Sequence, residues 1–164
     1  MVEETILTAL RNHGLPGSAL IIEITETAAL TEIRGAERFA AQMKRLGISL
    51  SLDDFGSGFG SFNRLKRMTF DFVKIYGEFV ASARESPVDR ALMRSIIRVA
   101  HELDKRVVAE HVADQETLEL VRSEGADFAQ GYHLGKPMPP DDFIDRLPAW
   151  LIRFAVGTGV GVRH

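Results

Sequence analysis

Residues 51–60 read SLDDFGSGFG, and the two adjacent aspartates in this stretch decide how the surrounding chain is interpreted. Asp53 and Asp54 end the alternating apolar segment ISLSLDD at 48–54, which predicts a strand. Neighbouring side chains on a strand point to opposite faces, so both carboxylates can share one site only if the strand ends there and the chain turns. The Gly-Ser-Gly sequence at 56–58 supplies such a turn.

Two carboxylates side by side indicate one of two local roles. Without a nearby cation they repel each other, and one of them would hold a proton. A divalent metal ion removes this conflict, and converging carboxylates suit the hard cations Mg²⁺ and Mn²⁺. Alternatively, Asp54 caps a helix predicted over SFNRLKRM at 61–68, or opens an Asx turn. The pair alone leaves both interpretations open.

The rest of the chain alternates predicted strands with predicted helices. Strands are expected at 18–25, 48–54, 70–75, 106–112 and 127–132. Helices are expected at 2–13, 35–47, 61–68, 87–104, 115–125 and 140–154. This alternation predicts parallel βαβ units, arranged either in an open doubly wound sheet or in a closed barrel.

Polar residues recur at the carboxyl ends of the predicted strands, and their position favours the barrel. They are Glu23, Glu26, Asp53, Asp54, Lys74, Glu110 and Gln130. A TIM-type barrel collects its active site from the ends of several strands. An open sheet usually has a glycine-rich phosphate loop after its first strand, and EITETAAL at 23–30 has no glycine. We therefore expect an α/β fold of the barrel type.

Composition limits the classes of function. The chain has 164 residues, of which 45% are hydrophobic, and a formal net charge of −3, so it lacks the basic excess of a nucleic-acid-binding protein. It has no cysteine, which excludes disulfides and thiolate metal ligands. No apolar run approaches the roughly 18 residues that span a bilayer, and the first residues are not typical of a signal peptide. We expect a cytoplasmic domain without a membrane or nucleic-acid partner.

Five segments, in this order, resemble the EAL domain, a bacterial cyclic-di-GMP phosphodiesterase module. They are IIEITET, SLDDFGSGFGSFNRLK, FVKIYGEFV, RVVAEHV and FAQGYHLGKPMP, and the resemblance covers residues 1–147. It implies a TIM-like barrel and a hydrolase of signal transduction that opens cyclic-di-GMP to linear pGpG with two Mg²⁺ or Mn²⁺ ions. We expect an EAL-like domain over 1–154 and an irregular tail over 155–164.

The resemblance also implies roles for individual residues. It implies metal ligands at Glu23, Asp53, Asp54 and Glu110, and a loop anchor at Glu26. It implies catalytic roles for Lys74, Glu110 and Gln130, and substrate contacts for Gln130 and Pro137. Each position also has a structural alternative, such as an ion pair between Lys74 and Asp53.

Several differences from the family pattern predict weakened catalysis. A TIM barrel has eight strands in about 250 residues. The family's EAL signature segment, with its metal-binding glutamate, and an asparagine on a later strand have no counterpart in this sequence. Tyr76 stands where the family has an acid, and a phenol with a pKa near 10 is a poor ligand for a hard metal at pH 7. Ala113 replaces a second glutamate. We expect a partial barrel that lacks its first strands.

Three functions therefore compete. The first is an active cyclic-di-GMP phosphodiesterase. The second is a module that binds the nucleotide or a protein without hydrolysis, with one weakly held metal ion, and the third is a segment of a larger protein. The differences favour the last two. Unpaired edges at 18–25 and 127–132 predict a homo-oligomer, and an upstream sensor domain, a diguanylate cyclase (GGDEF) domain or another signalling protein is a further expected partner.

Overall fold

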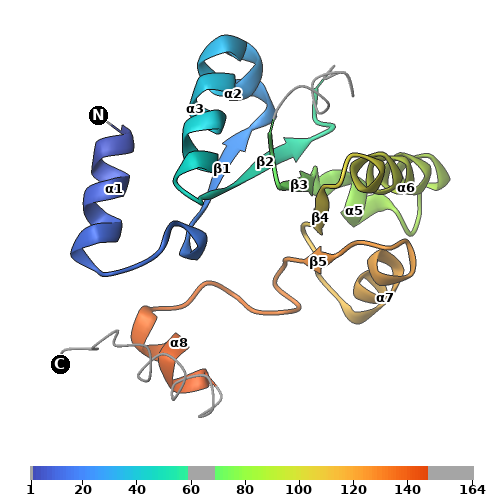
Figure 1. Cartoon of the computed structure of the whole chain (residues 1–164). Coiled ribbons are helices and arrows are strands. Elements are labelled where there is room, and N and C mark those ends of the chain that lie inside the picture. The colour runs from blue at the N-terminus through green and yellow to red at the C-terminus, as the bar shows by residue number, and fades with distance from the viewer. Residues whose placement is uncertain (1, 59–68, 148–164) are drawn as a thin grey trace. The chain divides into compact units, whose positions relative to one another are not determined.

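The computed structural model describes residues 2–58 and 69–147, which divide between two compact units (Figure 1). Residues 17–135 form the larger unit, which contains a five-stranded sheet. Residues 1–16 and 136–164 form the other unit, whose described helices are α1 (Val2–Asn12) and α8 (Pro140–Arg146). The helix predicted at 61–68 and the tail predicted at 155–164 lie outside the described residues.

The sheet is parallel, and its strands follow one another in the order of the sequence, β1-β2-β3-β4-β5. They are β1 (Ile21–Thr25), β2 (Ser49–Phe55), β3 (Phe72–Ile75), β4 (Arg106–Ala109) and β5 (Phe128–Ala129). Right-handed crossovers between strands in this order place the connecting helices on one side of the sheet, as in a (β/α) barrel. A doubly wound sheet would reverse its strand order, and the described strands show no reversal. The barrel-type α/β fold is confirmed.

Helices fill the connections between the strands. They are η1 (Gly17–Ala19), α2 (Glu26–Thr31), α3 (Ile33–Arg45), α5 (Gly77–Ser82), α6 (Pro87–Glu102) and α7 (Gln115–Ser123). The sequence did not predict α2 and α5, because six residues are too few to show a helical period. No described helix has the length and apolar character needed to cross a membrane.

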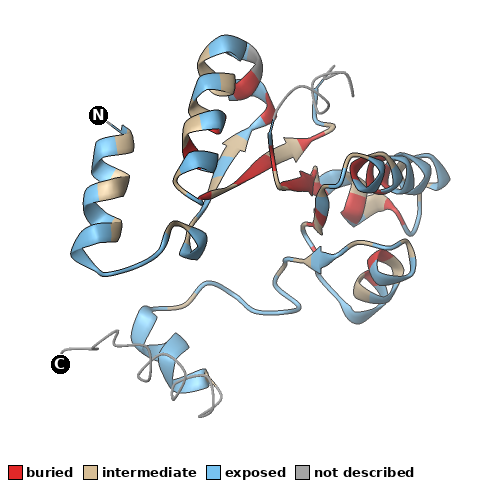
Figure 2. Cartoon of the chain, in the orientation of Figure 1, coloured by how far each residue is buried: buried red, intermediate tan, exposed pale blue. Residues whose placement is uncertain are grey.

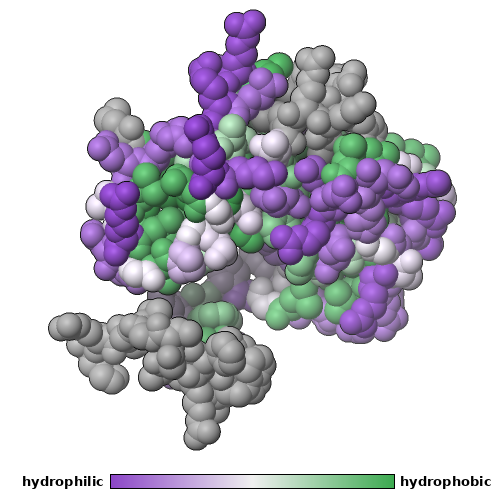
Figure 3. All heavy atoms as spheres, in the orientation of Figure 1, coloured by the Kyte–Doolittle hydropathy of each residue, from purple (hydrophilic) through white to green (hydrophobic). Residues whose placement is uncertain are grey.

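The two faces of the sheet differ in what covers them. One face packs against the helices, with α3 on β2 and α6 on β3 and β4. The strand residues on this face are buried: Leu50, Leu52, Val73, Ile75, Val107 and Ala109. From α6, Met93, Ile97 and Ala100 complete this core. The outer surface over α6 is mostly hydrophilic, as Figure 3 shows.

The opposite face carries the polar residues, and the two edge strands are its least covered part. Ile21 on β1 is 49% exposed and Phe128 on β5 is 45% exposed. Figure 2 shows the contrast between these edges and the buried β2 and β3. The edges expected at both ends of a partial barrel are therefore present at β1 and β5 in the described sheet.

Candidate functional site

The two adjacent aspartates lie in a β-bulge near the end of β2. Leu52 pairs with Val73 and Phe55 pairs with Ile75, so Asp53 and Asp54 together lie opposite the single residue Lys74. An extra residue of this kind breaks the alternation of side chains. Asp54 adopts the left-handed backbone conformation, with a φ of 55°. The expectation that the strand ends at the aspartates is therefore wrong: β2 continues to Phe55, and the bulge brings both carboxylates to one side.

Lys74 on β3 is the central cation of the site. Lys74 is 4% exposed. Its Nζ lies 2.8 Å from Glu110 Oε1, 3.0 Å from Glu23 Oε2 and 3.1 Å from Asp53 Oδ1. Burial lowers the pKa of the Lys74 ammonium, but the contacts with Glu110, Glu23 and Asp53 more than offset this effect and raise it above its ordinary value. Lys74 is therefore a permanent positive charge among three carboxylates.

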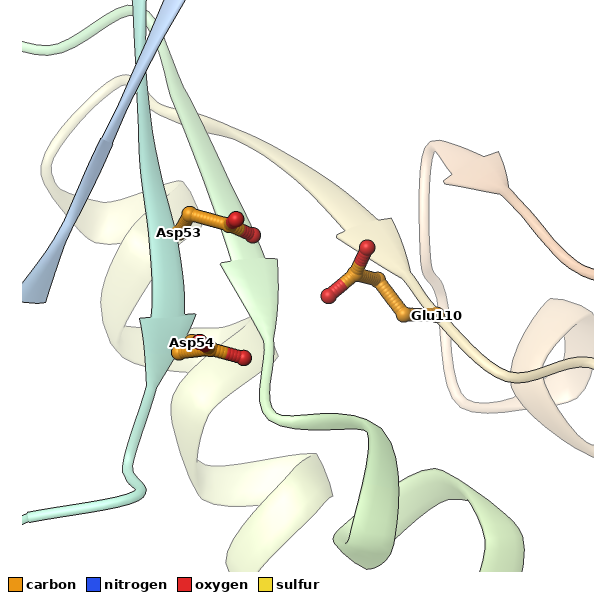
Figure 4. A group of neighbouring side chains, drawn as sticks. All are labelled: Asp53, Asp54 and Glu110. Carbon is orange, nitrogen blue, oxygen red and sulfur yellow. The ribbon is translucent and has the colours of Figure 1, made fainter.

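Asp53, Asp54 and Glu110 form the group that could hold a metal ion. One carboxylate oxygen from each lies within 4.8 Å of the others, and all three residues are half-buried. Figure 4 shows Glu110 reaching toward the two aspartates from the chain that follows β4. Carboxylate oxygens are the ligands that Mg²⁺ and Mn²⁺ prefer, so the donor set fits such a cation. Among the described residues, Glu23 does not belong to this group; its carboxylate accepts a hydrogen bond from Lys74 Nζ.

Glu26 supports the loop that follows the aspartates. The residue is the first of α2 and is 4% exposed. Its Oε2 accepts a hydrogen bond from the backbone N–H of Gly56, at 3.0 Å. Thr25, directly before it, caps α2 by accepting a hydrogen bond from the N–H of Ala28. A carboxylate buried at the start of α2 thereby ties β1 to the end of β2.

Gln130 has no described contact with the acidic group. Gln130 follows β5 and is exposed, and its backbone bonds to the oxygen of Ala109 and the N–H of Val112. These bonds hold the chain after β5 beside the chain after β4, where Glu110 lies. Pro137 is exposed and belongs to the unit formed by residues 1–16 and 136–164.

Tyr76 lies directly after β3, at the residue that precedes α5. Its pKa is raised, chiefly by a hydrogen bond with Glu78, and in smaller part by the negative charge of Asp54. Its ring packs edge-on against Phe79, with the centroids 5.8 Å apart. The phenol therefore stays neutral at pH 7 and adds no negative charge beside Asp54.

Two residues that the sequence interpretation missed adjoin the site. His111 directly follows Glu110 and has a φ of 56°, a conformation unusual for a residue with a side chain. Ser51 lies two residues before Asp53, is 2% exposed, and has a hydroxyl without a hydrogen-bond partner among the described residues. The strand period could have placed Ser51 beside Asp53, whereas nothing in the sequence reveals the backbone angle of His111.

The sequence of the chain is similar to those of known proteins. The profile of the EAL domain family matches residues 1–137. The chain is 38% identical over 138 residues to the cyclic di-GMP phosphodiesterase PdeF of Escherichia coli, covering 84% of this chain and 18% of PdeF. It is 35% identical over 141 residues to the cyclic di-GMP phosphodiesterase PdeB of Shewanella oneidensis, covering 86% of this chain and 16% of PdeB.

The fold is also found among solved structures. The solved structure of the PaMucR phosphodiesterase in complex with c-di-GMP superposes on this chain with a TM-score of 0.81 at 31% identity, covering 85% of this chain and 57% of that one. Compared with the two curated relatives, the chain spans less than a fifth of the length of PdeF and of PdeB. The family profile, the sequence identity and the superposition all lead to the same assignment, and the chain belongs to the EAL domain family.

Proposed function

We propose that this chain is a cyclic-di-GMP-binding segment of an EAL domain, that its acidic group holds one divalent cation, and that its own hydrolytic activity is weak or absent. The observation that carries the proposal is the convergence of Asp53, Asp54 and Glu110 within 4.8 Å. The names of PdeF and PdeB, and the nucleotide in the MucR complex, support cyclic-di-GMP as the ligand.

The residues of the group divide their roles by charge and position. Asp53, Asp54 and Glu110 would hold Mg²⁺ or Mn²⁺, which would neutralise phosphate charge and polarise phosphoryl oxygens when bound. Lys74 fixes Asp53 and Glu110 from the buried side and keeps Glu23 bound at 3.0 Å. Glu26 holds the loop after β2 through Gly56. Gln130 and Pro137 remain proposed substrate contacts.

Weak hydrolysis follows from the number of available ligands. Three carboxylates converge among the described residues, and two neighbouring cations repel each other, so a two-metal site needs more negative charge than these three supply. The neutral Tyr76 supplies no further charge beside Asp54, and among the described residues the Glu23 carboxylate does not converge with the other three. A single ion stabilises one side of an in-line displacement, whereas a two-metal site stabilises both the attacking and the leaving oxygens.

Calorimetry with Mn²⁺ and cyclic-di-GMP, together with chromatography of the nucleotide, tests the proposal. We expect one Mn²⁺ per chain, nucleotide binding that weakens at least 10-fold in Asp54→Asn, and release of pGpG at background level in the wild type and in Tyr76→Asp. Exposed Asp104→Asn serves as the matched control and should bind normally. Two tight Mn²⁺ sites with rapid release of pGpG would instead establish an active phosphodiesterase. Absence of nucleotide binding would leave a protein-binding module.

The larger protein is part of the same proposal. Because the chain spans 18% of PdeF, we propose that it works beside other domains, such as a sensor or a diguanylate cyclase (GGDEF) domain. The full name of one relative, the bifunctional diguanylate cyclase/cyclic di-GMP phosphodiesterase MucR of Pseudomonas aeruginosa, supports the second of these. The cytoplasmic location expected from the sequence stays a prediction.

A further inference from the structure

Ser51 lies beneath the acidic site on the polar face of the sheet. It precedes Asp53 by two residues on β2, so the two side chains share a face. In the register of the sheet, Ser51 pairs with Glu23 on β1 and with Phe72 on β3. Lys74 follows Phe72 by two residues and shares its face for the same reason. Ser51 is therefore surrounded by three members of the site, Glu23, Asp53 and Lys74.

The ion pair between Lys74 and Glu23 explains why Ser51 is buried. These two residues lie on β3 and β1, which are separated by β2. Adjacent strands are about 4.8 Å apart, so β1 and β3 are separated by about 10 Å. The two side chains span this separation and meet over β2. They meet close to Ser51, which is 2% exposed.

Two buried oxygens near this ion pair have no hydrogen-bond partner among the described residues: Ser51 Oγ and Asp53 Oδ1. Asp53 Oδ1 lies 3.1 Å from Lys74 Nζ, an ion-pair contact without regular hydrogen-bond geometry. A hydroxyl can donate, and a carboxylate oxygen can accept. Buried polar atoms are rarely left unpaired, and one water molecule can bridge two such atoms. The two oxygens are thus complementary neighbours on one strand face.

We propose that Ser51 is a positioning residue for Asp53. Its hydroxyl donates a hydrogen bond to the Asp53 carboxylate, directly or through one water molecule, when a cation entering the group draws that carboxylate away from Lys74. Ser51 then keeps Asp53 aimed at the cation without contacting the cation itself. This inference rests on the proposed function, because it assigns Ser51 to the metal ion that Asp53, Asp54 and Glu110 would hold.

Mn²⁺ calorimetry of the full 164-residue chain tests this role with two comparisons between side chains that differ in the hydroxyl group. Ser51→Ala removes only the hydroxyl, and we expect Mn²⁺ binding to weaken about 5-fold, the effect of one hydrogen bond. Ser51→Thr and Ser51→Val have the same size as each other and differ in the hydroxyl, so the threonine variant should bind about 5-fold more tightly than the valine variant. Ser49→Ala, on the same strand face, should bind like the wild type.

The outcomes separate the two proposals. If the wild type and Ser51→Ala bind Mn²⁺ equally, the role of Ser51 is refuted while the metal site stands. If the wild type takes up no Mn²⁺, the proposed function fails, and the role of Ser51 fails with it. Equal binding by Ser51→Thr and Ser51→Val would show that only the size of residue 51 matters, which also overturns the inference. Circular dichroism of each variant confirms that the comparison is made between folded chains.

Discussion

Lys74 Nζ lies 2.8 Å from Glu110 Oε1, so a buried ammonium on β3 is joined to the carboxylate that directly follows β4. The same ammonium contacts Glu23 and Asp53, which belong to β1 and β2. One side chain thus connects four consecutive strands at the end where their polar residues gather. The acidic site is already partly neutralised by the chain itself, and a cation entering the proposed site would compete with Lys74 for Asp53 and Glu110.

Replacing Lys74 by methionine should make the fold dependent on metal. The change keeps an unbranched side chain that is one atom shorter but leaves Glu23, Asp53 and Glu110 without their cation, and we expect the free energy of unfolding to fall by about 3 kcal/mol. Mn²⁺ should then raise the melting temperature of Lys74→Met more than that of the wild type. Thermal unfolding with and without Mn²⁺ measures both effects. Lys44→Met, at an exposed position of α3, is the control. Equal stability of Lys74→Met and the wild type would contradict the central role of this cation.

Removing the Glu26 carboxylate should loosen the loop after β2. Glu26→Ala leaves the N–H of Gly56 without its acceptor, and a lost partner of this kind costs about 1–3 kcal/mol. Glu26→Gln keeps an acceptor oxygen and should cost less. Hydrogen exchange of the Gly56 amide reports the change directly, with exposed Glu102→Ala as the control. Unchanged protection of this amide in Glu26→Ala would show that the hydrogen bond does not hold the loop.

The sequence predicted the strands better than it predicted the side-chain geometry at their ends. All five expected strands occur, and the helix predicted at 87–104 occurs as α6, which begins at Pro87. Periodicity suffices for these elements, because a buried strand or a long amphipathic helix repeats its pattern over many residues. The candidate site residues were predicted from their place at strand ends, and in the structure Lys74 contacts Glu23, Asp53 and Glu110, while their roles stay predictions.

The β-bulge at the aspartates and the left-handed angles of Asp54 and His111 could not be predicted from the sequence. Each depends on pairing with residues distant along the chain: the bulge exists only relative to β3, and the His111 side chain packs against Gly77. Local propensity would have favoured glycine at both left-handed positions. The ion pair of Lys74 and Glu23 over β2 could not be predicted for the same reason, because these residues are distant in sequence and meet only when the sheet has formed.

The effect of Gly77→Ala on stability should have opposite signs in the wild type and in His111→Gly. A Cβ on Gly77 would overlap with the imidazole of His111, so Gly77→Ala has to displace this ring. We expect Gly77→Ala to destabilise the wild type by about 1–2 kcal/mol. In His111→Gly the ring is absent, and the same change should stabilise by up to about 1 kcal/mol, because alanine favours the start of α5. Urea unfolding of the four chains measures the coupling; additive effects would rule out the contact.

The carboxylate of Glu124 should make part of the stability dependent on pH. Glu124, at the end of α7, accepts hydrogen bonds from Arg94 and Arg90 of α6, and Arg94 chiefly lowers its pKa from 4.5 to about 2. A carboxyl whose folded pKa is depressed stabilises the fold above its ordinary pKa, and this contribution is lost as the pH falls from about 4.5 to about 2.

Glu124→Gln isolates this contribution. Both arginines are substantially exposed, which screens the ion pairs, so we expect the variant to lose about 1 kcal/mol at pH 7. The difference from the wild type should become small at pH 2, where Glu124 is almost fully protonated in the unfolded state and about half protonated in the folded state. Urea unfolding across this pH range measures the difference. A constant difference at every pH would mean that packing, and not charge, holds Glu124.

The exposed edge strands predict that the chain associates with itself. β1 and β5 are the ends of the described sheet, and each carries an exposed apolar residue, Ile21 and Phe128. Unpaired strand edges are templates for pairing with another chain, and an inward-facing charge on such an edge opposes this pairing. We therefore expect multi-angle light scattering at micromolar concentration to give a mass above that of one chain, and Ile21→Lys to return it toward the monomer.

Leu92→Lys introduces the same charge at an exposed apolar position of α6 and should leave the assembly unchanged. A monomeric mass at all concentrations, with the β1 amides protected from hydrogen exchange, would show that the edge is covered within one chain.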